Sequence, residues 1–139
     1  MRRVEDVHVG ERLPSASQTI GQADLVRYAG ASGDFNPLHW DAGFAARVSP
    51  TGGVIAHGML SMGYVSRHVA DWAGGPEHVE HLATHFRAPC PVGATVELGG
   101  EVLAVDPEAR TATLAVWVVL EDGSPVVDRK RSRARVRLA

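Results

Sequence analysis

One cysteine and no long apolar run set the first limits on this sequence. Because Cys90 has no second cysteine to pair with, no disulfide can form within the chain, which fits a reducing, cytoplasmic environment. No stretch of about 18 uncharged apolar residues occurs, so we expect no membrane-spanning helix. The basic residues Arg2 and Arg3 are not followed by an apolar run, and we therefore expect no secretory signal.

The composition that is present is typical of a soluble globular protein. Of the 139 residues, 45% are hydrophobic and 22% are charged. This length corresponds to one domain, residues 1–139, which can bury a core without disulfide bonds.

The net charge of −2 conceals an uneven distribution along the chain. Residues 129–139 carry six of the 14 basic side chains and no acidic one. In a strand, alternate side chains point to the same face. If residues 129–137 form a strand, one face carries Arg129, Arg131, Arg133, Arg135 and Arg137. Such a stripe fits either a solvated face that protects a sheet edge or a docking surface for a phosphorylated or acidic partner. Because the stripe is short and the rest of the chain is acidic, we expect no nucleic-acid partner.

Hydrophobic spacing predicts helices in the first half of the chain. A helix should begin at Gly21 or Gln22 and end at Ser32–Gly33. Residues 34–39 contain turn-forming pairs and predict a loop, and residues 42–47 could form one or two helical turns. Residues 54–72 are apolar on nearly all sides up to Val65, which is typical of a buried helix.

Strand patterns dominate the second half. They cover residues 81–88, 95–105, 111–120 and 126–138, with a further short strand considered within 11–18 and a hairpin turn at 121–124. The pair Gly99–Gly100 predicts a bulge. One buried helix followed by four antiparallel strands predicts an α+β fold whose sheet wraps around the helix. Because exposed sheet edges favour association, we expect an oligomer.

The densest group of chemically useful residues lies in the predicted loop 34–39. Asp34 and His39 are five residues apart. Gly33 permits a tight backbone, and Pro37 restricts both itself and Asn36. A carboxylate and an imidazole held in this way can bind a water and move its proton. Alternatively, Asp34 caps a turn and His39 packs on the surface.

A second group, Ile55 to Leu60, lies where the buried helix should begin. Free N–H groups at a helix start attract negative charge, and Gly58 has no side chain to block its N–H. An oxygen that gains negative charge during a reaction could therefore be stabilised there. Alternatively, Gly58 only allows close helix packing, and for His57 we favour a neutral structural role.

The remaining histidines give no metal signal. His81 and His85 would share one face of a predicted strand, but zinc needs more ligands than these two. We therefore expect no metal site and no other cofactor.

Together the two groups resemble the MaoC-like dehydratase family, which includes the R-specific enoyl-CoA hydratases. The resemblance runs from Tyr28 through the motif Ser32-Gly33-Asp34-x-Asn36-Pro37-Leu38-His39 to Ala45, and recurs at Ala56-His57-Gly58-Met59-Leu60. Within the family, the chain most resembles the catalytic B subunit of the actinobacterial-type (R)-3-hydroxyacyl-ACP dehydratase.

This resemblance implies a hot-dog fold, in which a curved antiparallel sheet surrounds a long helix and two such folds pair. It implies that Asp34 and His39 are the catalytic acid/base pair and that the Gly58 N–H binds the thioester oxygen. The residues expected to shape the loop or contact substrate are Asn36, His57, Met59 and Ser66. The reaction implied is hydration of trans-2-enoyl thioesters or dehydration of (R)-3-hydroxyacyl thioesters.

The implied partners are an acyl-CoA or acyl-carrier-protein substrate and either a second copy or a second hot-dog subunit. Arg129, Arg131 and Arg133 would then dock the carrier. Two rival functions remain open. A hot-dog thioesterase usually has an acid on or beside its central helix, yet residues 58–68 contain none. A non-catalytic acyl-binding or partner subunit would not need both Asp34 and His39.

Overall fold

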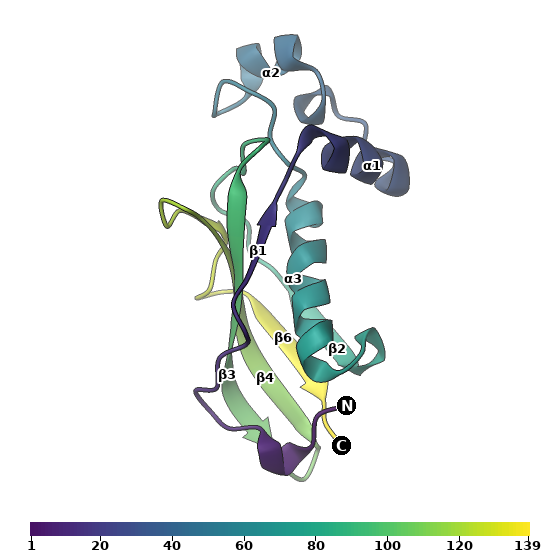
Figure 1. Cartoon of the computed structure of the whole chain (residues 1–139), viewed down its shortest axis with the longest axis vertical. Helices are drawn as coiled ribbons and strands as arrows, with labels where there is room; N and C mark the ends of the chain where they lie inside the picture. Colours follow the sequence, from purple (N-terminus) through teal and green to yellow (C-terminus); the bar gives the residue numbers. More distant parts are fainter.

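The computed structural model describes all 139 residues, Met1–Ala139. An antiparallel sheet of six strands lies along one long helix, α3 (Gly58–Ala73), and two shorter helices, α1 (Gln22–Ser32) and α2 (Ala42–Val48), sit at one end (Figure 1). The strands are β1 (Ala16–Thr19), β2 (Val79–Ala83), β3 (Thr95–Asp106), β4 (Thr111–Leu120), β5 (Pro125–Val127) and β6 (Arg133–Arg137). Single 3-10 turns are η1 (Val4–Asp6), η2 (Pro37–His39) and η3 (Pro76–His78). The predicted α+β class is confirmed.

The strands do not follow one another in the sheet. Their order is β1-β3-β4-β6-β2, and β5 pairs with the end of β4. The longest pairing is the β3–β4 hairpin, and β6 pairs with β4 through Leu114 and Ala134. The first and second strands therefore form the two edges of the sheet.

The prediction of a single strand over residues 126–138 was wrong. It forms β5 and β6, separated by a turn at 128–132. The Ser132 hydroxyl accepts a hydrogen bond from the His85 backbone N–H at 2.9 Å, and the Asp128 N–H donates to the His85 carbonyl. The partner strand breaks at the same level, since β2 stops before His85 and Phe86 then pairs with Val127.

The predicted bulge at Gly99–Gly100 was also misplaced. The register of β3 and β4 shifts between Val102 and Ala104, whereas Gly99 pairs regularly with Trp117. A Cβ at position 99 would collide with the Trp117 indole. Glycine is therefore needed there so that the ring can lie across the neighbouring strand, and not to bend the strand.

The helix α3 packs one side against the sheet. Its buried apolar side chains, Val65, Val69 and Trp72, belong to the same core as Leu114 and Val116 of β4. The expectation of a helix buried on all sides was wrong for the single chain. An exposed stripe runs along the opposite side through Met59, Gly63, Arg67 and Asp71.

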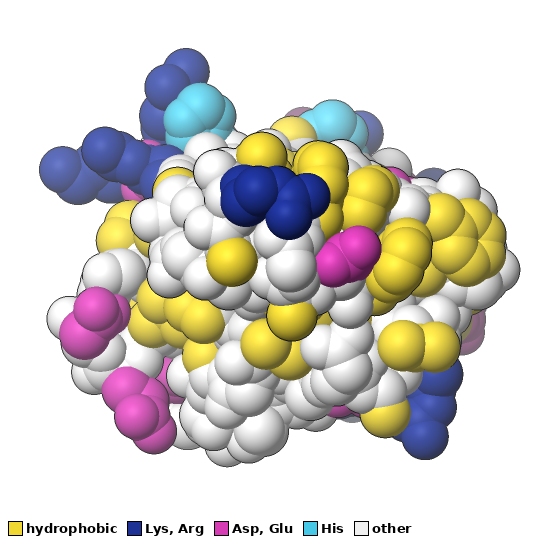
Figure 2. Space-filling view, turned by 90° about the horizontal axis from the view of Figure 1, so that it is seen from above, with side chains coloured by type: hydrophobic (Ala, Val, Ile, Leu, Met, Phe, Trp, Pro, Cys, Tyr) yellow, Lys and Arg dark blue, Asp and Glu magenta, His cyan; other side chains and the backbone are white.

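The end of the molecule that carries α1 and α2 is apolar in places. Figure 2 shows hydrophobic side chains scattered over this end among few charged ones. The exposed aromatic side chains in this part of the chain are Phe35 and Trp40. No helix has both the length and the apolar character required to span a membrane.

Candidate active site

The loop after α1 is held by a ladder of side-chain-to-backbone hydrogen bonds. The helix α1 ends at Gly33, whose φ of 76° is the left-handed conformation that glycine adopts easily. The Ser32 hydroxyl accepts from the Asp34 N–H at 3.2 Å, and Asp34 Oδ1 accepts from the Asn36 N–H at 3.2 Å. Asn36 Oδ1 in turn accepts from the Leu38 N–H at 3.0 Å and caps η2. Asn36 therefore shapes the loop through this hydrogen bond.

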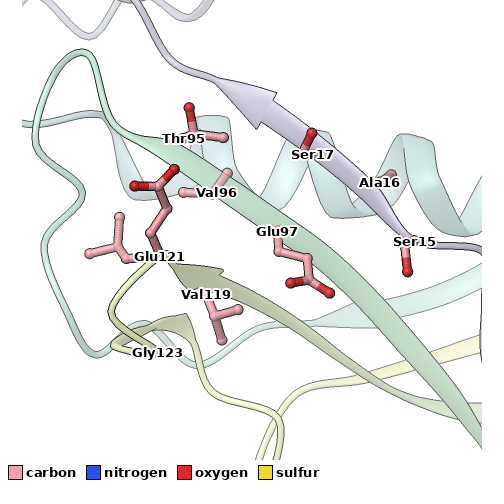
Figure 3. A pocket seen from close by; sticks show the side chains of 10 residues that line it. Ser15, Ala16, Ser17, Thr95, Val96, Glu97, Val119, Glu121 and Gly123 are labelled. Atoms are coloured by element: carbon pink, nitrogen blue, oxygen red, sulfur yellow. The ribbon is translucent and has the colours of Figure 1, made fainter.

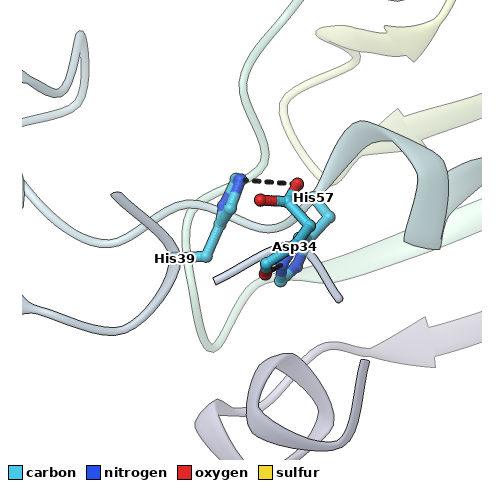
Figure 4. A group of neighbouring side chains, drawn as sticks. All are labelled: Asp34, His39 and His57. Carbon is cyan, nitrogen blue, oxygen red and sulfur yellow. Dashed lines mark hydrogen bonds and ion pairs between the residues drawn. The ribbon is translucent and has the colours of Figure 1, made fainter. Parts of the chain in front are cut away.

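These turns bring Asp34 and His39 together. Asp34 Oδ2 lies 3.9 Å from His39 Nε2, and the carboxylate is directed toward the ring (Figure 4). His39 Nδ1 lies 2.7 Å from the Ile55 carbonyl, which can only accept a hydrogen bond. In the neutral ring the proton is therefore on Nδ1, and the lone pair of Nε2 faces Asp34. The Asp34 side chain is 51% exposed and that of His39 11%, so the pair lies where a buried ring meets solvent.

His57 lies beside this pair and precedes the first turn of α3. Its ring is almost completely buried and stacks on the His39 ring with 3.8 Å between centroids. Its Nε2 donates to the Asp34 backbone carbonyl at 3.1 Å. Burial is the main reason that the pKa of His57 lies below its ordinary value. The lowered pKa favours the neutral form of the ring.

A cavity of about 340 Å³ lies at the start of α3, and Gly58 and His39 are among the residues that line it. The Gly58 N–H donates to no protein acceptor, and α3 has no side-chain cap at this end. Asp34 does not line the cavity itself, but its carboxylate faces the His39 nitrogen. The arrangement thus places a proton-accepting ring and a free backbone donor on the walls of one cavity.

The sequence analysis gave no site role to several of the lining residues, among them Ser61, Phe86, Arg87 and Cys90. Ser61 lies three residues after Gly58 and hence on the same side of the helix, a signal that was available. The other three belong to the connection between β2 and β3. Phe86 and Arg87 are placed by the pairing of residues 86–88 with β5, and the Cys90 carbonyl accepts from the Ala56 N–H. No local pattern predicts these contacts.

Other predicted site residues lie outside the cavity lining. Met59 is 55% exposed, and Ser66 is half-buried two helical turns beyond Gly58. Arg129 pairs with Glu101, and Arg133 donates to backbone carbonyls. Arg131 contacts the His85 ring, two residues from Arg87 at the cavity. Of the predicted stripe, only residues 133, 135 and 137 lie in a strand.

Asp34, His39 and His57 supply three potential metal-binding atoms within 4.8 Å of one another. Tetrahedral zinc ligands lie about 3.4 Å apart and direct their lone pairs to one point. Here the two imidazoles are stacked, and His57 Nε2 already donates to a carbonyl. Stacked rings cannot direct their lone pairs to one ion, so this geometry favours proton transfer over metal binding.

A larger hollow of about 560 Å³ lies elsewhere, on β1, β3 and β4 (Figure 3). Its only ionisable side chains are Glu97 and Glu121, and it has neither a histidine nor a helix start. We therefore place the chemistry at the smaller cavity, where donor and acceptor groups converge.

Comparison with known protein families identifies the family of this chain. The model of the MaoC-like domain matches residues 5–121. The chain belongs to the MaoC-like dehydratase family. It is 39% identical over 112 residues to the 3-hydroxybutyryl-CoA dehydratase of Methylorubrum extorquens, covering 80% of this chain and 70% of that protein. It is 34% identical over 131 residues to the (R)-specific enoyl-CoA hydratase of Rhodospirillum rubrum, covering 88% and 89%.

Solved structures give the same fold. The (R)-hydratase of A. caviae involved in PHA biosynthesis superposes with a TM-score of 0.87 at 29% identity, covering 97% of this chain and 99% of that one. A MaoC-like dehydratase superposes with a TM-score of 0.92 at 34% identity, and this chain covers 42% of that longer protein. The ChsH1–ChsH2 complex of Mycobacterium tuberculosis matches with a TM-score of 0.82 at 25% identity over 96% of this chain and 99% of that one. The expected hot-dog fold is confirmed.

Proposed function

We propose that this protein adds water to trans-2-enoyl-CoA thioesters and removes it from (R)-3-hydroxyacyl-CoA thioesters, with Asp34 and His39 as the acid/base pair. The names of both relatives describe hydro-lyases acting on CoA thioesters, which bears out the predicted enzyme class. The observation that carries the assignment of residues is the pairing of His39 Nε2 with Asp34 Oδ2 at 3.9 Å, next to the cavity that begins at Gly58.

The geometry suits a water-addition reaction. The 3.9 Å between the carboxylate and the imidazole is longer than a direct hydrogen bond, and one water oxygen can bridge it. The thioester oxygen would accept from the free Gly58 N–H, which stabilises negative charge as the enolate develops. The enoyl group would then lie in the cavity between these two anchors.

The proposed step returns the pair to its starting state. The water oxygen bonds to C3 while one of its protons passes to the Asp34–His39 pair. The C2–C3 double bond opens toward C2, and C2 receives a proton from the pair. The net change is addition of OH to C3 and H to C2, and the reverse sequence is dehydration.

The thioesterase alternative is weaker in this geometry. The only acid on α3 is Asp71, which lies in the last turn, whereas the cavity opens at the first. A non-catalytic acyl-binding subunit would not require the ordered turns that hold Asp34 next to His39. Neither rival explains why the Asp34 carboxylate faces His39 at a cavity that the unpaired Gly58 N–H also lines.

Arginine side chains lie beside the cavity, where the carrier end of the substrate would bind. Arg87 is exposed at the cavity and pairs with Asp128, and Arg131 lies on the neighbouring turn. We assign phosphate contacts to this region, with Arg129 on the same turn and Arg133 at the start of β6. CoA is the carrier suggested by the relatives' names, whereas an acyl carrier protein would match the predicted B-subunit resemblance. Comparing crotonyl-CoA with a crotonyl-carrier protein distinguishes them.

A second subunit would cover the surfaces left open in the single chain. The exposed stripe on α3 and the apolar side chains at the α1–α2 end favour such pairing. Either a second copy or a different hot-dog chain, as in the ChsH1–ChsH2 complex, would serve. The mass of the purified protein in solution decides between monomer and oligomer.

The function is tested by hydration of crotonyl-CoA, followed as loss of enoyl absorbance. Asp34→Asn and His39→Ala should each lower kcat by about 10²- to 10⁴-fold, because each removes one member of the acid/base pair. Their circular dichroism spectra should match the parent. Equal rates in parent and variants would exclude the pair, and release of free thiol without hydration would support the thioesterase.

A further inference from the structure

A buried imidazole next to the proposed pair has no part in the reaction described above. His57 is 2% exposed, although histidine is seldom so completely buried. Three groups from different parts of the chain surround its ring. The edge of Tyr28 from α1 approaches with 4.8 Å between centroids and an angle of 63°, His39 stacks on it at 3.8 Å, and the Asp34 carbonyl accepts its proton.

The ring therefore joins the two catalytic candidates. Its hydrogen bond reaches the backbone of Asp34, and its face lies against the ring of His39. A third contact links the same residues. His39 Nδ1 donates to the carbonyl of Ile55, which lies two residues before His57 in the chain. A small movement of this ring would change both the position of the carboxylate and the tilt of the imidazole.

We propose that His57 is a positioning residue, which holds Asp34 by a hydrogen bond and His39 by stacking so that the pair keeps its reactive geometry. This inference rests on the proposed function of that pair. The Nε2–H of His57 donates to a carbonyl, so in the neutral ring Nδ1 carries the lone pair. No hydrogen-bond partner is found for this buried Nδ1. A ring used only as a helix cap would instead accept from the backbone of α3, which His57 does not do.

The surroundings favour the neutral form of the His57 ring. Burial lowers the pKa of His57 most strongly, the hydrogen bond to Asp34 opposes this, and the neighbouring His39 lowers it further. The titratable groups in contact with the ring are Tyr28, Asp34 and His39. A second positive charge beside His39 would oppose proton uptake by that ring, so a neutral neighbour suits the proposed step.

Two amide substitutions separate positioning from simple stabilisation. In His57→Gln the amide nitrogen can reach the place of Nε2 and donate to the Asp34 carbonyl. In His57→Asn the amide ends about one bond too early, but asparagine is a favoured residue before a helix and should cap α3 well. Asn should therefore keep or raise the thermal midpoint and still lose activity.

The test is kcat and KM for crotonyl-CoA in the parent, in both variants and in Asp34→Asn. We expect kcat of His57→Asn to fall about 10- to 100-fold with KM nearly unchanged, and His57→Gln, which restores the hydrogen bond but not the stacking, to recover part of that loss. Parent-like kcat in His57→Asn, equal losses in both variants, or a change confined to KM would overturn the positioning role while leaving the proposed function intact. An inactive parent would instead overturn the proposed function, and this role with it.

Discussion

The two ends of α3 are built in opposite ways. At the C-terminal end, His68, Val69, Trp72 and Ala73 are buried, and the Gly74 and Gly75 N–H groups both donate to the Ala70 carbonyl. At the N-terminal end, the Gly58 N–H and the Ser61 hydroxyl have no protein partner, and a cavity opens beside them.

One end of α3 therefore contributes to the stability of the fold, and the other end supplies groups for the proposed reaction. A capped, buried helix end contributes apolar burial to folding. An uncapped end leaves N–H groups available, which costs stability but offers a site for developing negative charge. Substitutions at the two ends should therefore affect different measurements.

The largest effect on folding is expected at the C-terminal end. Trp72 packs in the core, and its Nε1 donates to Glu11 at 3.1 Å. Trp72→Ala should lower the free energy of unfolding by about 3–5 kcal/mol, with kcat unchanged well below the thermal midpoint. Urea titration and the hydration assay measure the two quantities. Glu108→Ala, in the exposed turn between β3 and β4, is the control and should change stability by less than about 0.5 kcal/mol. A loss of kcat in folded Trp72→Ala would contradict the separation.

A smaller effect of opposite sign is expected at the N-terminal end. The Ser61 hydroxyl is buried without a hydrogen-bond partner. Ser61→Ala removes this unsatisfied group and should raise the free energy of unfolding by about 1 kcal/mol. Ser66→Ala, half-buried farther along α3, should change it by less than about 0.5 kcal/mol. A clear loss of stability in Ser61→Ala would show that the hydroxyl has a structural partner.

The smallest effect concerns pH. Burial lowers the pKa of His68 below its ordinary value, and no partner is found for its Nε2. The unfolded chain therefore binds more protons below about pH 6.5, so stability falls as pH drops through that value and is unaffected well above it. The thermal midpoint should fall less between about pH 7.5 and pH 5 in His68→Leu than in the parent. These two pH values lie about one unit or more on either side of the ordinary histidine pKa. An unchanged pH dependence would mean that His68 is not responsible.

Sequence reasoning succeeded where the determining interactions are local. The turn that holds Asp34 next to His39 follows from short-range hydrogen bonds of Ser32 and Asn36. The hydrophobic pattern also predicted the central helix, but it began the helix at Val54, whereas α3 begins at Gly58. The alternation of β6 was also visible, since Ala134 and Val136 are buried as expected.

The failures concern contacts between distant segments. The break between β5 and β6 depends on Ser132 bonding to His85, which lies 47 residues away. The same pairing brings Phe86 and Arg87 to the cavity. The space left by Gly99 is understood only when Trp117 is seen across the sheet. Strand periodicity specifies which face a side chain occupies but not its cross-strand neighbour.

The central claim is that the free N–H at the start of α3 binds the thioester oxygen opposite the Asp34–His39 pair. Gly58→Pro removes this N–H, while proline is well tolerated at the first helical position and the φ and ψ of His57, −61° and 131°, suit a residue before proline. Gly58→Ala is the matched control, because its Cβ meets the Phe86 ring at 3.4 Å but its N–H remains. The account predicts that kcat for crotonyl-CoA is about 10²- to 10³-fold lower in the proline variant than in the alanine variant. Equal kcat in two folded variants would contradict it.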